Sequence, residues 1–363
     1  MNLCNSDLPK EIEDEITSQN DIEIFECSQK GANGYVFFGF NNLIKANVAI
    51  KFYYFDSLSN EVERLYHIKH ENIADIIGAK TLRNGWACFT MPYYEYGDLD
   101  NHMQSNNSDF SNSINITREL LNALSVLHNE PNNLVHRDLK PANILITQRI
   151  KPILADFGSV REIDNEKDYT VSSRHAVLYK PPESITNNKY YRASDIYQIG
   201  MVMYQMLGGF LPYDFIEWLN KKERNKYEDL DTDYDKSKYV DKIIESKIVN
   251  GKLLNLNSLP YYLPTELKKI LKKATHKEIF KRYKNTLEFQ CALNRVSKIP
   301  NWCIDTGIPM IKNINGYDYR IIEKKQGFIC EKKSNCGTKW RKYSPISIGD
   351  KRIVAEQINQ KIR

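Results

Sequence analysis

The chain has 363 residues, of which 41% are apolar and 27% charged, an ordinary composition for a protein that buries a sizeable core. The net charge of +5 is too small for this length to indicate that the whole chain binds nucleic acid or a membrane. The excess is local, because residues 300–363 carry 13 Lys and Arg against 6 Asp and Glu, and the remainder is slightly acidic. The seven cysteines include no CxxC pair, which is typical of a reduced intracellular protein.

Two segments bear on where the protein resides. Residues 1–20 form an acidic segment that lacks the apolar run of a signal peptide. Ile196–Pro212 is uncharged, but it is too short for a comfortable membrane span, so a buried core helix is the better prediction. We therefore expect a cytoplasmic protein with no membrane partner.

Strand-like alternation dominates residues 21–91, which we expect to form a β-rich N-terminal lobe. A short helix is expected at Asn60–His67. The expected strands lie at Asp21–Phe25, Tyr35–Phe38, Asn47–Ile50, near Ile73–Ile77 and at Trp86–Met91.

The apolar period changes to that of a helix further along, and residues 97–298 are predicted to form a mainly helical lobe. One apolar stripe begins at Ile116 and another at Leu267. Two polar stretches, Asn101–Asn115 and Lys221–Lys242, are expected to be surface loops or solvated helices.

Residues 301–363 mix aromatic side chains with many lysines and predict a small separate module. Strands are expected around Tyr319–Ile322 and Gly327–Glu331. This composition is compatible with nucleic-acid binding, because basic and stacking groups serve that purpose. We favour the alternative, a β-rich domain that docks on the rest of the chain or on a protein partner. Three cysteines lack a well-placed fourth ligand for zinc: Cys303, Cys330 and Cys336.

The strongest chemical signature lies between residues 136 and 158. His136–Asn143 reads HRDLKPAN, and the triplet Asp156–Gly158, which reads DFG, follows thirteen residues after Asn143. Upstream, Val48–Lys51 reads VAIK. These motifs, in this order, resemble those of the eukaryotic-type (Hanks-type) serine/threonine protein kinases. The resemblance extends over about residues 21–297.

The resemblance implies an α+β bilobal protein kinase fold, with an N-lobe at about 21–91, a C-lobe at about 97–298 and the module as an appendage. It implies ATP-dependent phosphorylation of protein substrates, which relies on positioning and charge neutralisation. Asp138 would orient or deprotonate the acceptor hydroxyl, and Lys140 would contact the γ-phosphate. Asn143 and Asp156 would supply oxygen ligands to Mg²⁺, with Mn²⁺ as an alternative.

The same resemblance assigns the groups that hold the phosphates of ATP. Lys51 would bind the α- and β-phosphates, and Glu61 would hold that lysine, with Glu63 as the rival carboxylate. Gly31 and Gly34 would let the backbone of a lid approach the phosphates closely.

Other family positions are structural or surround the adenine ring. Glu183, in a PPE run, would pair with Arg282, and Asp195 would anchor the backbone of the catalytic loop. His136 and Phe157 would stack in a spine that joins the lobes. The residues expected around the adenine are Val36, Ala49, Met91, Tyr94 and Leu145.

Two positions bear on specificity and regulation. Lys140 favours Ser/Thr over Tyr as the acceptor. Arg137 is typical of kinases that are activated when the following loop is phosphorylated, since the phosphate pairs with this arginine. Self-association for trans-autophosphorylation is therefore expected. The candidate phosphosites are Thr170, Ser172 and Ser173.

Two departures from the family pattern concern the lid and the acceptor site. Gln29 stands where the lid has its first glycine, and Ala176 stands where a threonine usually contacts the catalytic aspartate. The alternative function is a pseudokinase or scaffold whose C-terminal module binds a protein or nucleic-acid partner. Retention of Lys51, Asp138 and Asp156 favours the enzyme, because a scaffold does not require them.

The abundance of Asn, Lys and Ile is typical of an AT-rich genome, which is compatible with a bacterium, a phage, a large DNA virus or some protists. By analogy with free-standing bacterial and mobile-element kinases, signalling or phage exclusion is the expected setting.

Overall fold

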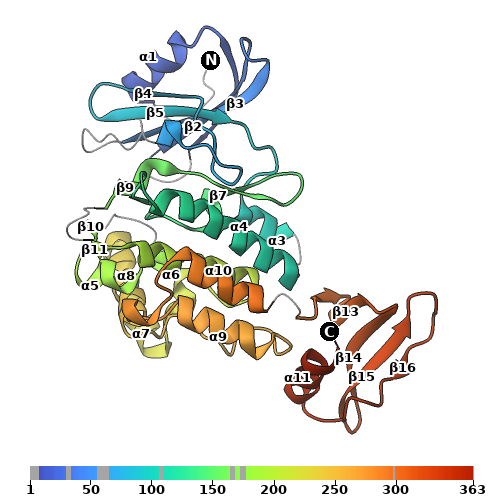
Figure 1. Ribbon diagram of the computed structural model, residues 1–363. Coiled ribbons are helices and arrows are strands. Elements are labelled where there is room, and N and C mark those ends of the chain that lie inside the picture. The colour runs from blue at the N-terminus through green and yellow to red at the C-terminus, as the bar shows by residue number, and fades with distance from the viewer. Residues whose placement is uncertain are drawn as a thin grey trace.

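The computed structural model describes residues 8–29, 34–54, 65–105, 109–163, 168–171, 177–296 and 299–362. Figure 1 shows three successive parts: a sheet with one helix, a mainly helical part, and a second sheet with one helix at the C-terminus. The first two parts confirm the expected bilobal α+β arrangement.

The N-lobe is built on a five-stranded antiparallel sheet in the order β1-β2-β3-β5-β4. Four of the five expected strands are confirmed. The strands are β1 Ile22–Gln29, β2 Gly34–Asn41, β3 Ala46–Tyr54, β4 Gly78–Thr81 and β5 Trp86–Pro92.

The expected strand near Ile73–Ile77 is wrong, because β4 begins only at Gly78. The apolar residues before it are buried for a different reason. The chain here runs against the C-lobe, where the amide of Ala74 donates to the carbonyl of Leu154 at 2.8 Å. The amide of Leu154 donates in turn to the carbonyl of Asn72 at 2.8 Å. The segment therefore joins the two lobes and is not part of the N-lobe sheet.

A helix that was not expected, α1 (Lys10–Ser18), covers the outer face of the N-lobe sheet (Figure 1). Its residue Ile12 is fully buried in a cluster with Phe37, Ile50 and Phe52. Glu15, which is also buried, pairs with Lys80 of β4 at 2.5 Å. The acidic N-terminal segment thus closes one side of the sheet and leaves the other side facing the C-lobe.

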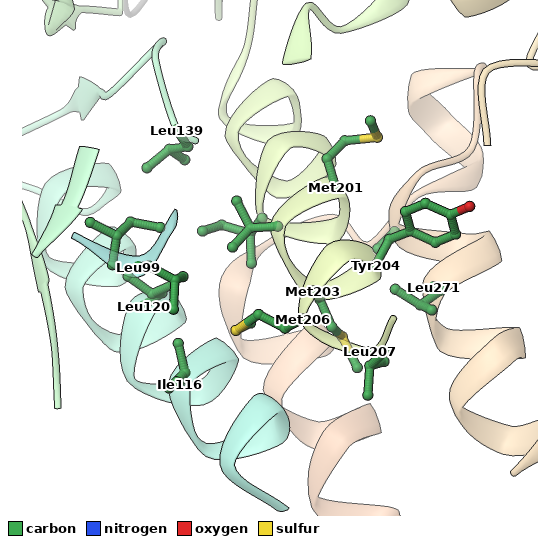
Figure 2. Packing of buried hydrophobic residues seen from close by; sticks show 14 of the residues in the cluster. Leu99, Ile116, Leu120, Leu139, Met201, Met203, Tyr204, Met206, Leu207 and Leu271 are labelled. Carbon is green, nitrogen blue, oxygen red and sulfur yellow. The ribbon is translucent and has the colours of Figure 1, made fainter. Parts of the chain in front are cut away.

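The C-lobe is organised around α6, which is almost entirely buried and fulfils the prediction of a core helix. In Figure 2, Met206 of α6 points toward Ile116 and Leu120 of α4. Leu271 of α9 lies on the other side of α6.

The helices are α3 Leu99–Ser105, α4 Phe110–His128, α5 Pro182–Thr186, α6 Arg192–Met206, α7 Lys221–Glu228, α8 Asp233–Val249, α9 Thr265–Ala274 and α10 Thr286–Arg295. Short strands complete the lobe: β6 Leu134–Val135, β7 Ile144–Ile146, β8 Pro152–Leu154, β9 Arg161–Glu162, β10 Thr170–Val171 and β11 Lys189–Tyr190.

The two polar stretches differ in outcome. Lys221–Lys242 forms α7, which buries no residue, and the largely solvated first part of α8, as expected. Asn101–Asn115 is not a surface excursion throughout, because α4 begins at Phe110, whose side chain is buried. Asp109 caps this helix by accepting a hydrogen bond from the amide of Asn112 at 2.7 Å. A single aromatic residue among Asn and Ser was too weak a signal to reveal the start of the helix.

The C-terminal module is a five-stranded antiparallel meander followed by one helix. Both strands expected from the sequence are present. The apolar face of the sheet includes Ile311, Tyr319 and Ile321, and α11 packs on it through Val354 and Ile358. The elements are β12 Trp302–Asp305, β13 Ile308–Ile314, β14 Tyr317–Lys324, β15 Gly327–Ser334, β16 Arg341–Lys342 and α11 Lys351–Lys361.

Trp302 attaches this module to the C-lobe. Its side chain is 1% exposed, and its ring lies 5.2 Å from the ring of Tyr262, which stacks on Phe110 at 5.6 Å. The indole N–H donates to Asn359 Oδ1 at 2.8 Å, and Asn359 Nδ2 donates to the carbonyl of Tyr262 at 3.2 Å. One continuous hydrophobic core therefore runs from the C-lobe into the module.

Five of the described cysteines are free thiols, but Cys27 is disulfide-bonded, so the expectation of a fully reduced set is wrong at that position. Within the described ranges, no helix combines the length and the apolar character needed to cross a lipid bilayer.

Candidate active site

The loop of residues 136–143 follows β6. Its backbone is held by the side chain of Asp195, near the start of α6. This carboxylate is fully buried. It accepts hydrogen bonds from the backbone amides of His136 at 2.9 Å and Arg137 at 3.0 Å. Because Arg137 has a φ of 72°, its backbone is strained and needs such an anchor.

Three further residues complete this anchor, and sequence reasoning missed them. His128 Nε2 and the Tyr190 hydroxyl each donate to Asp195 at 2.8 Å. Gln198 Oε1 accepts from the amide of Leu139 at 3.0 Å. Gln198 could have been found, since it lies three residues after Asp195 on the same face of a helix. The other two carry no local signal, because only the fold brings them to α6.

The buried Asp195 carboxyl should make folding sensitive to acid. Burial raises its pKa, but hydrogen bonding and charge from His128, with smaller contributions from His136 and Arg137, leave that pKa below the ordinary value of 3.8. A carboxyl group whose pKa is lowered by folding stabilises the folded state at pH values above its unfolded-state pKa. That contribution is lost as the pH falls through the folded-state pKa. The wild-type free energy of unfolding should therefore drop steeply below about pH 4.

We expect the Asp195→Asn substitution to flatten this acid limb and to lower stability at pH 7 by about 3–5 kcal/mol, because buried donors lose their charged acceptor. Urea unfolding followed by circular dichroism from pH 7 to pH 3 measures both effects. The exposed Asp231→Asn serves as the control and should match the wild type throughout. An Asp195→Asn variant with the wild-type acid limb would contradict the prediction.

Asp138 lies at the centre of a compact group of polar side chains. Its carboxylate accepts from Lys140 Nζ at 2.9 Å and from Asn143 Nδ2 at 2.8 Å. Asn143 Nδ2 also donates to the backbone carbonyl of Asp138 at 2.8 Å. The carboxylate is thus fixed in orientation beside a lysine that is 24% exposed. Such a group can accept a proton from, or orient, a hydroxyl placed next to it.

Asp156 and Lys51 form a second pair, joined at 2.6 Å between Nζ and Oδ2. Burial raises the pKa of Asp156, but the charges of Lys51 and Lys140 outweigh it and bring that pKa to about 2. Asp156 has a φ of 63°, a strained backbone conformation.

Backbone and ring contacts connect these two groups. The amide of Ala155 donates to the carbonyl of Asn143 at 3.1 Å. His136 Nε2 donates to the carbonyl of Ala155 at 3.0 Å, and burial lowers the pKa of this imidazole. The ring of Phe157 lies 5.9 Å from that of His136, within the core that joins the lobes.

Asn143 and Asp156 fit a hard divalent cation by their chemistry. Both hydrogen bonds made by the Asn143 side chain use Nδ2, so its amide oxygen is not engaged in either. Asp156 binds Lys51 through Oδ2. Among the described residues, no group of three or more His, Cys, Asp or Glu side chains forms a metal cage. This suits Mg²⁺, which commonly uses one or two protein oxygens together with waters and substrate phosphates.

Strand register explains why the side chains expected around a nucleotide share one face of the N-lobe sheet. Val36 pairs with Lys51 across β2 and β3, and Ala49 pairs with Met91 across β3 and β5. These positions share the face opposite the one that α1 covers. Gly34 is required at the end of β2, because a Cβ there would lie 2.8 Å from the carbonyl oxygen of Phe52.

The C-lobe contributes a further residue that is expected around the adenine. Leu145 is bridged to Asp98, and the amide of Ile146 donates to the carbonyl of Gly97 at 2.9 Å. Tyr94 lies half-buried just after β5 and packs against the same core. The residues expected around adenine that the structure describes therefore come from both lobes.

Glu183 and Arg282 form a buried bidentate ion pair, with N–O distances of 2.6 and 2.8 Å. The guanidinium also donates to the carbonyls of Ala193 and His276 and lies over the ring of Tyr197, 4.8 Å from its centroid. Three of these hydrogen bonds thus tie α5 to the start of α6, and the others go to the carbonyls of His276 and Lys277, close to Arg282 in the chain.

Several sequence-predicted positions lie outside the described residues: Gly31, Glu61, Glu63, Ser172, Ser173 and Ala176. Gln29 ends β1. Thr170 pairs with Tyr190 in the β10–β11 ladder. Arg137, the expected phosphate partner, is buried, and its backbone amide donates a hydrogen bond to Asp195.

A family model for the protein kinase domain matches residues 29–292. A probable serine/threonine-protein kinase of Dictyostelium discoideum, samkB, is 34% identical over 167 residues, which cover 44% of this chain and 28% of the relative. A second probable serine/threonine-protein kinase of that organism is 32% identical over 212 residues, or 54% of this chain and 33% of the relative. A protein kinase and PP2C-like domain-containing protein of Arabidopsis thaliana is 25% identical over 315 residues, or 78% of this chain and 46% of the relative. The chain thus spans less than half the length of these curated relatives.

Proposed function

The chain belongs to the protein kinase domain family, and from this premise we propose that it transfers the γ-phosphoryl group of ATP to serine or threonine hydroxyls of proteins. The observation that carries the proposal is the joining of two polar groups at one site. One is Asp138 with Lys140 and Asn143, and the other is the ion pair of Lys51 and Asp156.

Each side chain has a task in this proposal. Asp138 orients the acceptor hydroxyl and takes its proton as the oxygen attacks the γ-phosphorus and the bond to ADP breaks. Lys140, held 2.9 Å from Asp138, balances the charge that moves with the phosphoryl group. Lys51 binds the remaining phosphates, and Asn143 and Asp156 hold Mg²⁺, which when bound neutralises phosphate charge. Mn²⁺ can take the same oxygen ligands.

Serine and threonine are the proposed acceptors because Lys140 follows Asp138 by two residues. The relatives named as serine/threonine kinases support this acceptor class. A cytoplasmic setting is proposed as well, since it supplies ATP, Mg²⁺ and protein substrates together.

Transfer of radiolabel from γ-labelled ATP to a generic protein substrate, such as casein or myelin basic protein, tests the proposal. The wild type should label serine and threonine, as phosphoamino-acid analysis reveals, and Asp138→Asn should reduce labelling by about 10²–10⁴-fold. The exposed Asp231→Asn is the matched control and should retain full activity. Labelling of tyrosine alone would overturn the acceptor class, and equal labelling by wild type and Asp138→Asn would overturn the mechanism.

Autophosphorylation in the loop between Asp156 and Glu183 is the proposed switch. Thr170 is half-buried in its short ladder with Tyr190, so a phosphate there would add charge beside α6 and Arg137. Ser172 and Ser173 are the neighbouring candidates.

Intact mass spectrometry after incubation with ATP and Mg²⁺ should detect added phosphate on the wild type and none on Asp138→Asn. Mixing an excess of Asp138→Asn with a trace of wild type should label the variant if one molecule phosphorylates another. Equal masses of the two proteins would contradict autophosphorylation but would leave transfer to other substrates intact.

A further inference from the structure

One side of the C-terminal module packs against the C-lobe. Its other end carries side chains that the kinase fold does not explain. Its apolar face and α11 are directed to the C-lobe through Trp302 and Asn359. In Figure 1, β15 and β16 lie on the far side of the module from the kinase lobes. We call the remaining group of side chains the basic end. It consists of Tyr317, Lys332, Lys333, Lys339, Trp340, Arg341, Lys342 and Tyr343.

Positive charge is concentrated here. Residues 317–343 carry 8 Lys and Arg against 3 Asp and Glu, which accounts for most of the excess of the whole module. Three of these cations are neutralised locally, since Arg320 and Lys324 pair with Glu331 at 2.7 and 3.8 Å and Lys333 pairs with Asp318 at 3.4 Å.

The other cations of the basic end are not balanced in this way. In the part of the chain that the structure describes, no carboxylate lies within ion-pair distance of four of them: Lys332, Lys339, Arg341 and Lys342. Lys332 faces Arg341 across the β15–β16 ladder, so like charges stand side by side. Opposed like charges destabilise a sheet pair, which indicates that these residues serve an anionic ligand.

Aromatic rings are interleaved with these cations. Lys332 Nζ lies 4.6 Å from the ring centroid of Tyr317 and 5.2 Å from that of Tyr343. The guanidinium of Arg320 lies 4.2 Å from the ring centroid of Trp340. The side chain of Tyr317 is 37% exposed, and Trp340 and Tyr343 are partly exposed. The rings are thus held in place by cations while part of each remains open to solvent.

We propose that the basic end binds single-stranded nucleic acid. This polymer alternates a charged phosphate with a flat base, and the basic end places cations and partly exposed rings on both faces of the edge strand β16: Tyr317, Lys332, Arg341 and Tyr343 on one face, and Trp340 with Lys342 on the other. A duplex would engage the cations only, because its bases are already stacked. A membrane surface would need exposed aliphatic side chains, and those of the described module, Ile348 and Ile353, lie outside the basic end.

Binding of a fluorescein-labelled dT₂₀ oligonucleotide to the full chain, followed by fluorescence anisotropy without ATP, tests the proposal. If four cations meet phosphates, affinity should fall about fiftyfold between 50 and 200 mM salt. Arg341→Glu with Lys342→Glu should weaken binding at least about tenfold and reduce the salt dependence. Trp340→Ala should weaken binding about tenfold with the salt dependence unchanged, and Trp340→Phe should restore most of it.

Lys221→Glu with Lys222→Glu in α7 is the matched control, since it makes the same charge change at two exposed lysines of the C-lobe. It should bind within about twofold of the wild type. Kinase activity and thermal midpoint, unchanged in each variant, show that the fold is intact. Asp138→Asn should bind like the wild type, so failure of the catalytic proposal is distinguished from failure of this one.

Four results would overturn the proposal: no binding by the wild type, equal binding of a 20-base-pair duplex, displacement of the oligonucleotide by polyglutamate as readily as by unlabelled dT₂₀, or unchanged binding by Trp340→Ala. The second and third would instead identify a general polyanion surface. The last would remove the stacking contribution on which the choice of a single strand depends.

Discussion

Replacing Asp156 by alanine is expected to reduce phosphoryl transfer by about a thousandfold or more. The substitution removes an oxygen ligand for the metal ion. It also leaves the ammonium group of Lys51 without the carboxylate that lies 2.6 Å away. In the proposed mechanism this ion pair positions Lys51 for the phosphates. The affinity for ATP and the rate of transfer should therefore both decrease.

Steady-state transfer to a protein substrate at several ATP concentrations measures kcat and KM separately. Asp75→Ala is the matched control, because it removes a carboxylate that also pairs with a lysine, Lys69, but is exposed. It should leave both constants within about twofold of the wild type. An Asp156→Ala enzyme within tenfold of the wild type would show that the Lys51–Asp156 pair does not serve catalysis.

A large effect on stability is expected for Trp302→Ala, which should lower the free energy of unfolding by about 3–5 kcal/mol, in the same range as Asp195→Asn. This change empties the space beside Tyr262 and leaves the buried Asn359 Oδ1 without its donor. A cavity and an unsatisfied polar atom act in the same direction. Urea unfolding followed by circular dichroism measures the effect.

Two variants help to separate these contributions. Trp302→Phe keeps a ring but removes the N–H donor, so it should lower stability by only about 1–2 kcal/mol. Ile353→Ala, on the exposed side of α11, is the control and should change stability by less than about 0.5 kcal/mol.

The same experiment tests how the module relates to the kinase domain. Because one core runs through both, the module and the C-lobe should unfold in a single transition. A separate early transition that Trp302→Ala alone shifts would mean that residues 301–363 fold as an independent domain, as first expected from composition.

The polar residues of the catalytic segment could be located from the sequence because their chemistry is local. Asp138, Lys140 and Asn143 lie within six residues, and their side chains meet through one tight loop. The strands of the N-lobe were visible for a similar reason, since alternation with a period of two follows from the geometry of each strand.

Other features depend on contacts between distant segments and left no local pattern. The apolar run at Ile73–Ile77 resembles a strand, yet it is buried because it bridges to β8 of the other lobe. The closure of the N-lobe sheet by α1 requires Ile12 to meet strands further along the chain. A segment buried by a distant part of the chain and a segment buried within a sheet both need apolar residues. Composition therefore does not distinguish the two.

By itself, the sequence determined the kind of chemistry and the order of its parts, because the reacting side chains come from short motifs whose spacing the backbone preserves. Only the tertiary structure brought His128 of α4 and Tyr190 of β11 to Asp195, the anchor of the catalytic loop that the motif resemblance had already indicated. It also decided which side of the C-terminal module is covered and which is open. This depends on the contact between Trp302 and Tyr262, which no periodic pattern within either segment predicts.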